Sequence, residues 1–303
     1  MLPSALMTDV SRLFEFAFSG RAVLLTGQNL DPEGSEALRQ QLIKALSLAP
    51  SASIKEAFGS TSDMAAVMPI LRGIGSKSSS NLRKVADIPW AAVFTSSFDD
   101  SFSAQLAIES SQGRRLRHLC IDNELPSFFA RRNDVLTVSH LAHTSNDQSL
   151  TGIPISGRQI SRAERFLIPG ILRHLAQAVG PAHMLCIAGI GSGDLLDYKL
   201  VADFAGELDP ENVYWFVAAH DQLDLQLISD RLPKINLVGV ALTDSLENYL
   251  ATTVNKVEAG RRREQVLELN DLVVTVQAEG GQRAVSFRAD ELREFRRHLV
   301  VVS

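Results

Sequence analysis

Short apolar runs alternate with polar stretches of helical length along most of the chain. The runs lie at residues 21–27, 90–95, 116–121, 135–138, 184–190, 213–218 and 235–240. Most of them are continuously apolar, which is typical of parallel strands covered on both faces. Stretches with apolar residues at helical spacing lie between them, at 10–18, 34–48, 161–179 and 194–208. The pattern predicts an α/β fold, a Rossmann-like doubly wound, mostly parallel sheet with helices on both faces.

The last part of the chain has a different pattern. Residues 258–264 (EAGRRRE) are charged and follow the last predicted helix. Beyond them we expect strands at 267–276 and 283–287, a short helix at 290–298 and an apolar end. A free terminus is usually polar. We therefore expect one domain over 1–257, the start of a further small α/β element or domain over 258–303, and a chain that is a piece of a longer protein.

Composition narrows the class of protein. Hydrophobic residues make up 45% and charged residues 21% of the chain, which is typical of a globular domain. The net charge is −5 and the pI about 5.8, so we expect no direct binding to duplex nucleic acid. No signal peptide is recognisable, and no apolar run reaches the roughly 18 residues that a membrane span needs. The sequence predicts a soluble, cytoplasmic protein.

Cysteine is rare. The chain has two cysteines, Cys120 and Cys186, each within an apolar run. A disulfide framework or a structural zinc site needs more sulfurs at close spacing. We expect a reducing compartment and no zinc.

Ligands of open α/β sheets bind at the carboxyl ends of the strands. After the first strand come Gly27, Gln28 and Asn29, ahead of a helix. Such a turn can hold a phosphate on backbone N–H groups. The three-glycine fingerprint is missing, however, and Asp31 and Glu33 place negative charge where a pyrophosphate would sit. The alternative is an ordinary turn that Asp31 caps.

The second strand runs into hydroxyls and carboxylates at 93–100 (VFTSSFDD), among them Thr95, Ser97 and Asp99. These groups suit contacts to a ribose or to a reacting bond. The alternative is that Ser97 or Asp99 caps the following helix.

Two further segments carry candidate chemistry. In residues 138–143 (VSHLAH), His140 and His143 follow a strand, and histidine is the natural general base near neutral pH. A surface or structural histidine is the alternative for either one. In residues 187–194 (IAGIGSGD), alternating glycines allow a ligand to approach the backbone closely. Gly189, Gly191, Ser192 and Asp194 are therefore candidate nucleotide contacts, although Asp194 also suits the N-cap of the next helix.

The order of these segments resembles one family. SIR2-like domains carry a glycine turn after an opening strand, a T-T-N-x-D segment, a K-L-H-G segment and a late F-I-G-x-S-x-x-D segment. This chain has LLTGQN (24–29), FTSSFDD (94–100), VSHLAH (138–143) and IAGIGSGD (187–194), in the same order and at similar spacing. The resemblance covers residues 10–255.

The resemblance implies a function. In the family an asparagine and a histidine act on NAD, positioning the ribose and assisting cleavage of the nicotinamide–ribose bond. Lysine deacetylases of the family carry a four-cysteine zinc ribbon, which two cysteines cannot form, so the chain does not resemble a deacetylase. It is more similar to SIR2-like domains of bacterial antiphage defence proteins, which hydrolyse NAD within longer chains or oligomers. NAD as substrate or ligand, a C-terminal domain or partner subunit, and a homo-oligomer are thus implied.

Three positions depart from the family pattern. Gly27 stands where the family has paired glycines, and Ser97 stands at the asparagine position, with Asp99 matching the aspartate. A serine lacks the carbonyl and the two N–H donors of an amide. Ala142 aligns with the family histidine, and a shift of one residue makes His143 the candidate base. The resemblance then implies His143, Asp99 and Ser97 as the catalytic set, and Gly27, Gln28, Asn29, Thr95, Gly189, Gly191, Ser192 and Asp194 as cofactor contacts.

Three hypotheses follow. The chain is a module that binds NAD or a related nucleotide with catalysis in doubt, an active NAD hydrolase that releases nicotinamide, or a non-catalytic scaffold for oligomerisation or signalling. An unrelated doubly wound nucleotide protein, such as a nucleosidase-like enzyme, would need the same cleft but not the four segments in this order.

Overall fold

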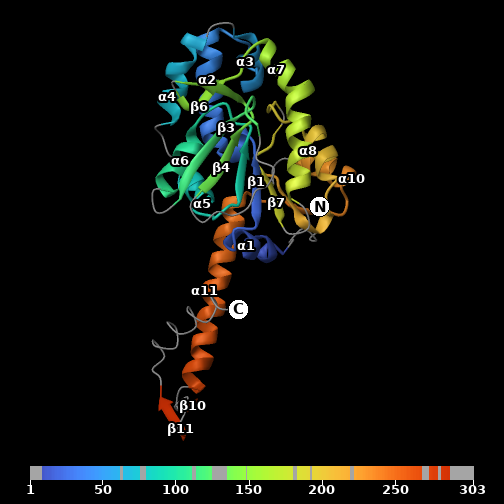
Figure 1. Cartoon of the computed structure of the whole chain (residues 1–303). Helices are drawn as coiled ribbons and strands as arrows, with labels where there is room; N and C mark the ends of the chain where they lie inside the picture. The colour runs from blue at the N-terminus through green and yellow to red at the C-terminus, as the bar shows by residue number, and fades with distance from the viewer. Residues whose placement is uncertain are drawn as a thin grey trace. The chain divides into compact units, whose positions relative to one another are not determined.

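A seven-stranded parallel sheet organises the first part of the chain (Figure 1). The computed structural model describes residues 9–61, 64–75, 80–110, 114–124, 135–147, 149–179, 183–191, 193–218, 222–267, 273–278 and 281–286. The strand order is β3-β4-β2-β1-β7-β8-β9. The strands are β1 (Ala22–Thr26), β2 (Ala92–Thr95), β3 (Arg115–Cys120), β4 (Val135–His140), β7 (Met184–Ala188), β8 (Val213–Phe216) and β9 (Asn236–Val238). All seven strands predicted from the apolar runs are present, and the α/β, Rossmann-like fold is confirmed.

Helices fill the segments between the strands. Their bounds are α1 (Ser11–Phe18), α2 (Pro32–Leu46), α3 (Ile54–Ser60), α4 (Met68–Gly75), α5 (Ser80–Ala86), α6 (Ser101–Ser110), α7 (Arg158–Arg162), α8 (Ile168–Val179), α9 (Tyr198–Ala205) and α10 (Gln222–Arg231). Short 3-10 turns lie at η1 (Gln28–Leu30), η2 (Met64–Ala66) and η4 (Pro210–Asn212), and the π-helical η3 (Ala163–Leu167) joins α7 to α8. The predicted helix at 194–208 begins only at Tyr198, because Asp197 caps it by accepting the Lys199 N–H at 2.7 Å.

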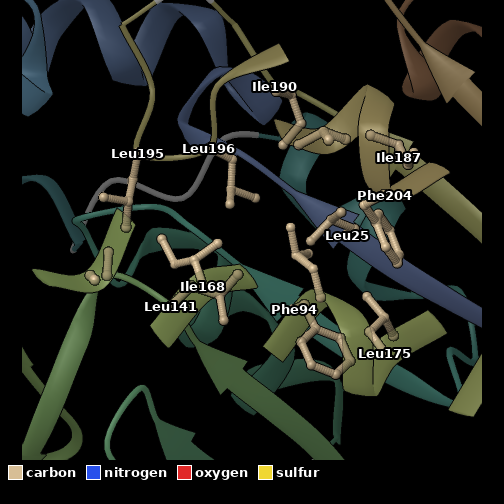
Figure 2. Packing of buried hydrophobic residues seen from close by; sticks show 14 of the residues in the cluster. Leu25, Phe94, Leu141, Ile168, Leu175, Ile187, Ile190, Leu195, Leu196 and Phe204 are labelled. Atoms are coloured by element: carbon tan, nitrogen blue, oxygen red, sulfur yellow. The ribbon is translucent and has the colours of Figure 1, made fainter. Parts of the chain in front are cut away.

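The centre of the sheet is the core of this part. Every residue of β1, β2, β7 and β8 is buried, as expected for strands with helices on both faces. Figure 2 shows Leu25, Phe94 and Ile187 of three strands near Ile168 and Leu175 of α8. At the edge, β3 alternates between exposed and partly buried positions before its last two residues are buried.

The direction of winding reverses at β1. The chain passes from β1 to its neighbour β2 on one side and later returns to place β7 on the other side. Val23 of β1 pairs with Ala92 of β2 and with Leu185 of β7, so the carboxyl ends of these three strands lie at one edge. Such a reversal marks the usual ligand crevice of doubly wound sheets.

A small hairpin that the sequence analysis did not anticipate follows β4. Strands β5 (His143–Asn146) and β6 (Ser149–Pro154) pair antiparallel. The backbone N–H of Ile121 donates to the His143 carbonyl at 2.8 Å, which ties the hairpin to the end of β3. His143 therefore begins a strand instead of lying in an open loop.

The sequence analysis expected the charged stretch at 258–264 to follow the last helix, and this expectation was wrong. Helix α11 (Leu242–Leu267) runs through it, because the stretch contains strong helix formers and no proline. Strands β10 (Val273–Ala278) and β11 (Gly281–Ser286) form a hairpin close to the predicted strands. The predicted helix at 290–298 lies outside the described residues. The chain divides into two compact units, residues 1–247 and 248–303, and the further domain over 258–303 stays a prediction. Within the described residues, no helix has the length and apolarity to cross a membrane.

Gly189 provides a test of the packing at the reversal point. It has φ +68°, and a Cβ there would lie 2.2 Å from the Leu30 nitrogen. We expect Gly189→Ala to lower the free energy of unfolding by roughly 2–4 kcal/mol, from backbone strain and overlap. Gly170→Ala in α8 is the control, because nothing lies within 4 Å of a Cβ there. It should raise stability by about 0.5–1 kcal/mol. Urea unfolding of both variants measures the difference, and equal effects would contradict this account.

Candidate functional site

The Gly27 turn leaves the carboxyl end of β1. The Gly27 N–H donates to the Ala188 carbonyl of β7 at 3.1 Å. A Cβ on Gly27 would lie 2.4 Å from the Gly189 carbonyl oxygen and 2.7 Å from Asp194 Oδ2. Glycine is needed here because the turn after β7 packs directly on this backbone.

The turn after β7 closes the crevice at the reversal point. The Asn29 N–H donates to the Gly189 carbonyl at 2.9 Å. A Cβ on Gly191 would lie 2.0 Å from Asn29 Nδ2, so these two residues are in close contact. The predicted cofactor contacts Gly27, Asn29, Gly189 and Gly191 are thus brought together, and they contact one another. Ser192 lies outside the described residues.

The Asp194 side chain links the turns after β1 and β7 by hydrogen bonds. Its side chain is buried, and its Oδ2 accepts the Gly191 N–H at 2.6 Å. The backbone N–H of Gln28 also donates to this carboxylate. Burial is the dominant effect and raises the pKa of Asp194 to about 7, although both hydrogen bonds and nearby Lys55 lower it. Asp194 is not the N-cap of α9, which is Asp197.

A second network joins the turns after β1 and β2. The Gln28 side chain is buried and crosses from one turn to the other. Its Nε2 donates to Asp99 Oδ2 at 2.5 Å, and its Oε1 accepts the Phe98 N–H at 2.9 Å. Ser97 Oγ donates to the same Asp99 oxygen at 3.0 Å. The other oxygen of Asp99 accepts the Ser101 N–H at 2.8 Å at the start of α6, which confirms a capping role for Asp99.

A pocket lies between the carboxyl ends of β1 and β2, beside the closed crevice. Its walls come from the turns after both strands, the first turns of α2 and α6, and Leu82 of α5. Its polar lining includes Thr26, Gln28, Asp31, Thr95, Ser97 and Asp99. The cavity volume of about 20 Å³ leaves room for about one water molecule. Asp31 occupies the N-cap position of α2, but its side chain makes no capping hydrogen bond.

His143 is not among the residues that line this pocket. It is 1% exposed, and its Nε2 lies 3.7 Å from Asp100 Oδ1. Thr151 of β6 donates to the other oxygen of Asp100 at 3.0 Å. Ala142, which aligns with the family histidine, is also buried. Of the predicted catalytic set, Ser97 and Asp99 line the pocket and His143 does not, although the Asp99 carboxylate is close enough to raise the pKa of His143 against the larger effect of burial.

Three histidines, His118, His140 and His143, lie close together. His118 of β3 and His140 of β4 approach with Nδ1 and Nε2 at 2.9 Å, and the ring of His140 meets that of His143 edge-on at 5.3 Å. His140 Nδ1, His143 Nδ1 and Asp100 Oδ1 are buried with no hydrogen-bond partner. Unpaired buried groups of this kind favour their neutral forms.

Burial sets the protonation of this histidine cluster. It lowers the pKa of His143 to about 4 and lowers the pKa values of His140 and His118 as well. His140 is further disfavoured as a cation by its two histidine neighbours. Burial also raises the pKa of Asp100, against the hydrogen bond from Thr151. The cluster is uncharged on its imidazoles at neutral pH.

Sequence reasoning missed the cluster partners His118 and Thr151. His118 lies in the middle of a strand, and only the parallel register of β3 with β4 places it beside His140. Thr151 reaches Asp100 through a hairpin that no apolar pattern indicated. Among the described residues, no group of three or more histidine, cysteine, aspartate or glutamate side chains is arranged to hold a metal ion.

Comparison with known proteins does not assign the chain to a family. No protein-family model matches the chain, and no match was found among curated proteins.

Asp194 offers a test of how the two turns are held. Its folded-state pKa of about 7 lies above the usual value of 3.8 for the side chain, so its contribution to stability is lost as pH rises through this window. Asp194→Asn keeps an acceptor without the charge and should be more stable than the wild type at pH 8, by at most about 4 kcal/mol. Asp194→Ala leaves two N–H groups without their acceptor and should lose about 1–3 kcal/mol at pH 5, with a smaller loss at pH 8 because the wild type is itself less stable there. Urea unfolding at both pH values measures this; a less stable Asp194→Asn at pH 8 would refute it.

The histidine cluster should make the protein less stable as pH falls, which is opposite to the effect of Asp194. The folded-state pKa of His143 is about 4 against the usual value of 6.5, so the unfolded chain takes up a proton first as pH falls. Stability from this group is complete above pH 6.5 and declines by about 3 kcal/mol toward pH 4. Asp194 opposes this trend, so the measurement is a comparison of slopes. Urea unfolding from pH 7 to 4.5 should show a shallower acid loss in His143→Gln than in the wild type. An unchanged slope would mean that His143 is not held neutral.

Proposed function

We propose that this chain is a SIR2-like module that has lost NAD hydrolysis and binds NAD or a related nucleotide through a ribose. The observation that carries the proposal is the pocket after β1 and β2, whose lining combines the carboxylate of Asp99, the amide of Gln28 and several hydroxyls. Carboxylates and amides are suitable partners for the hydroxyls of a sugar, which both donate and accept. The pocket must widen to admit one, because its present volume is about that of a water molecule.

Loss of hydrolysis follows from the groups that a bond-breaking step would need. Ser97 offers a hydroxyl where the family has an amide, and that hydroxyl already donates to Asp99. His143 is fully buried outside the pocket lining, and a pKa of about 4 makes it a weak base at neutral pH. No histidine lines the described pocket. The arrangement supports binding better than acid–base chemistry, in keeping with a defence module that senses a ligand or transmits a signal.

A scaffold without a ligand is the second candidate. The contacts that favour it are those of Asn29 with Gly189 and of Asp194 with Gly191, which close the crevice at the reversal point. In this alternative the polar side chains after the strands serve only to hold the turns together.

Incubation of the purified full chain with NAD separates these functions. We expect no release of nicotinamide, together with a higher melting temperature in NAD or ADP-ribose. A ligand at 100 times its Kd adds about 2.7 kcal/mol, which corresponds to roughly 5–10 °C for a domain of this size. Asp99→Asn keeps an acceptor for Ser101 but removes the charge, and it should weaken the thermal shift.

Two outcomes would contradict the proposal. Release of nicotinamide that disappears in His143→Ala would establish an active NAD hydrolase. Neither release nor a thermal shift, even at millimolar ligand, would leave the scaffold as the function.

A further inference from the structure

The charged side chains that line the pocket after β1 and β2 are negative. Among the described residues that line it are two carboxylates, Asp31 and Asp99, and no lysine, arginine or histidine. Two cations of nearby helices have other partners: Arg39 of α2 bonds Glu36, and Lys55 of α3 bonds Glu164 at 2.7 Å. A ligand that enters this pocket meets acceptors and negative charge, without a basic group to neutralise a phosphate.

Asp31 stands where a phosphate would otherwise be held. The N-terminus of a helix attracts anions through its unpaired N–H groups. At α2 the Asp31 carboxylate already lies there, since a Cβ on Gly34 would be 2.6 Å from Asp31 Oδ2. The carboxylate makes no capping hydrogen bond, and Asp31 is one of the residues that line the pocket. A phosphate at this helix end would be repelled by it.

Gln28 supplies the complementary donor. An amide has two N–H groups and two acceptor lone pairs. In Gln28 one N–H is used by Asp99 and one lone pair by the Phe98 N–H, which leaves one of each. The amide is held in one orientation by these bonds. A fixed donor beside a carboxylate matches a vicinal diol, whose hydroxyls donate to one group and accept from the other.

The remaining wall is apolar. Leu82 of α5 and Phe102 of α6 are buried side chains that line the same pocket. Apolar side chains opposite a diol-binding edge suit the flat face of a nucleobase.

We infer that the pocket selects an uncharged vicinal diol, the ribose of a nucleoside, and that Asp31 is the specificity residue that disfavours a phosphate beside it. This inference rests on the proposed function, because it names the part of the nucleotide that the same pocket recognises. It goes further in predicting that a nucleoside binds more tightly than its phosphorylated form.

Isothermal calorimetry on the full chain tests the inference with adenosine, 2′-deoxyadenosine, AMP and NAD at low salt. We expect adenosine to bind at least about tenfold more tightly than AMP, from a single unscreened charge repulsion. Removal of the 2′-hydroxyl should weaken binding about tenfold, because it leaves buried polar groups unpaired. Asp31→Asn should reduce the preference for adenosine over AMP by about tenfold while leaving adenosine affinity within about twofold.

Glu33→Gln is the matched control. Glu33 lies in the same first turn of α2 and undergoes the same change of charge, but it is exposed and is not among the pocket residues. It should change the preference by less than about twofold, because exposed charges are screened. A preference that shifts equally in both variants would reduce the role of Asp31 to general charge and overturn the assignment.

The outcomes separate this inference from the function on which it rests. If AMP or NAD binds the wild type as tightly as adenosine, the inference is overturned and nucleotide binding stands. If adenosine, AMP and NAD all fail to bind at millimolar concentration, both are overturned.

Discussion

The contact between the turns after β1 and β7 is the constraint on which the site depends. The two strands pair in parallel register from Ala22 with Met184 to Thr26 with Ala188, so their carboxyl ends reach the same level. Glycine at 27 and 189 lets the backbones that follow approach closely, and Asp194 bonds the N–H groups of both turns. These contacts close the crevice between β1 and β7, and the pocket lies instead between the carboxyl ends of β1 and β2.

The position of the pocket determines which chemical groups are available to a ligand. The crevice at the reversal point of a doubly wound sheet usually receives a dinucleotide on helix dipoles and bare N–H groups. Here the corresponding N–H groups already donate to Asp194 and to the Gly189 carbonyl, and the start of α2 is occupied by the Asp31 carboxylate. The groups that remain available are carboxylate, amide and hydroxyl. They favour recognition of a neutral, hydroxylated ligand over stabilisation of a developing charge.

The buried histidine cluster is not part of the pocket lining and has a different physical character. Its imidazoles are neutral because burial outweighs the attraction of the neighbouring carboxylates. Burial also favours the neutral form of Asp194, which for a carboxyl group is the protonated form. The domain therefore contains buried groups with opposite effects on stability as pH rises, because the neutral histidines favour higher pH and the protonated Asp194 favours lower pH. Stability at a given pH is the difference between these two effects.

The sequence by itself determined the fold class, because continuous apolar runs and helical spacing follow directly from burial on two faces. It also indicated that the turns after β1, β2 and β7 carry the polar residues of interest, since ligand-binding loops follow parallel strands. It did not indicate that Gly27 and Gly189 touch, that Gln28 clamps Asp99, or that His118 meets His140. These contacts join residues up to about 160 positions apart, and they depend on strand order and register. Only the tertiary structure decided that the glycine turns touch each other, that His143 is buried beside Asp100 and outside the pocket lining, and that Asp31 lines the pocket without a capping hydrogen bond.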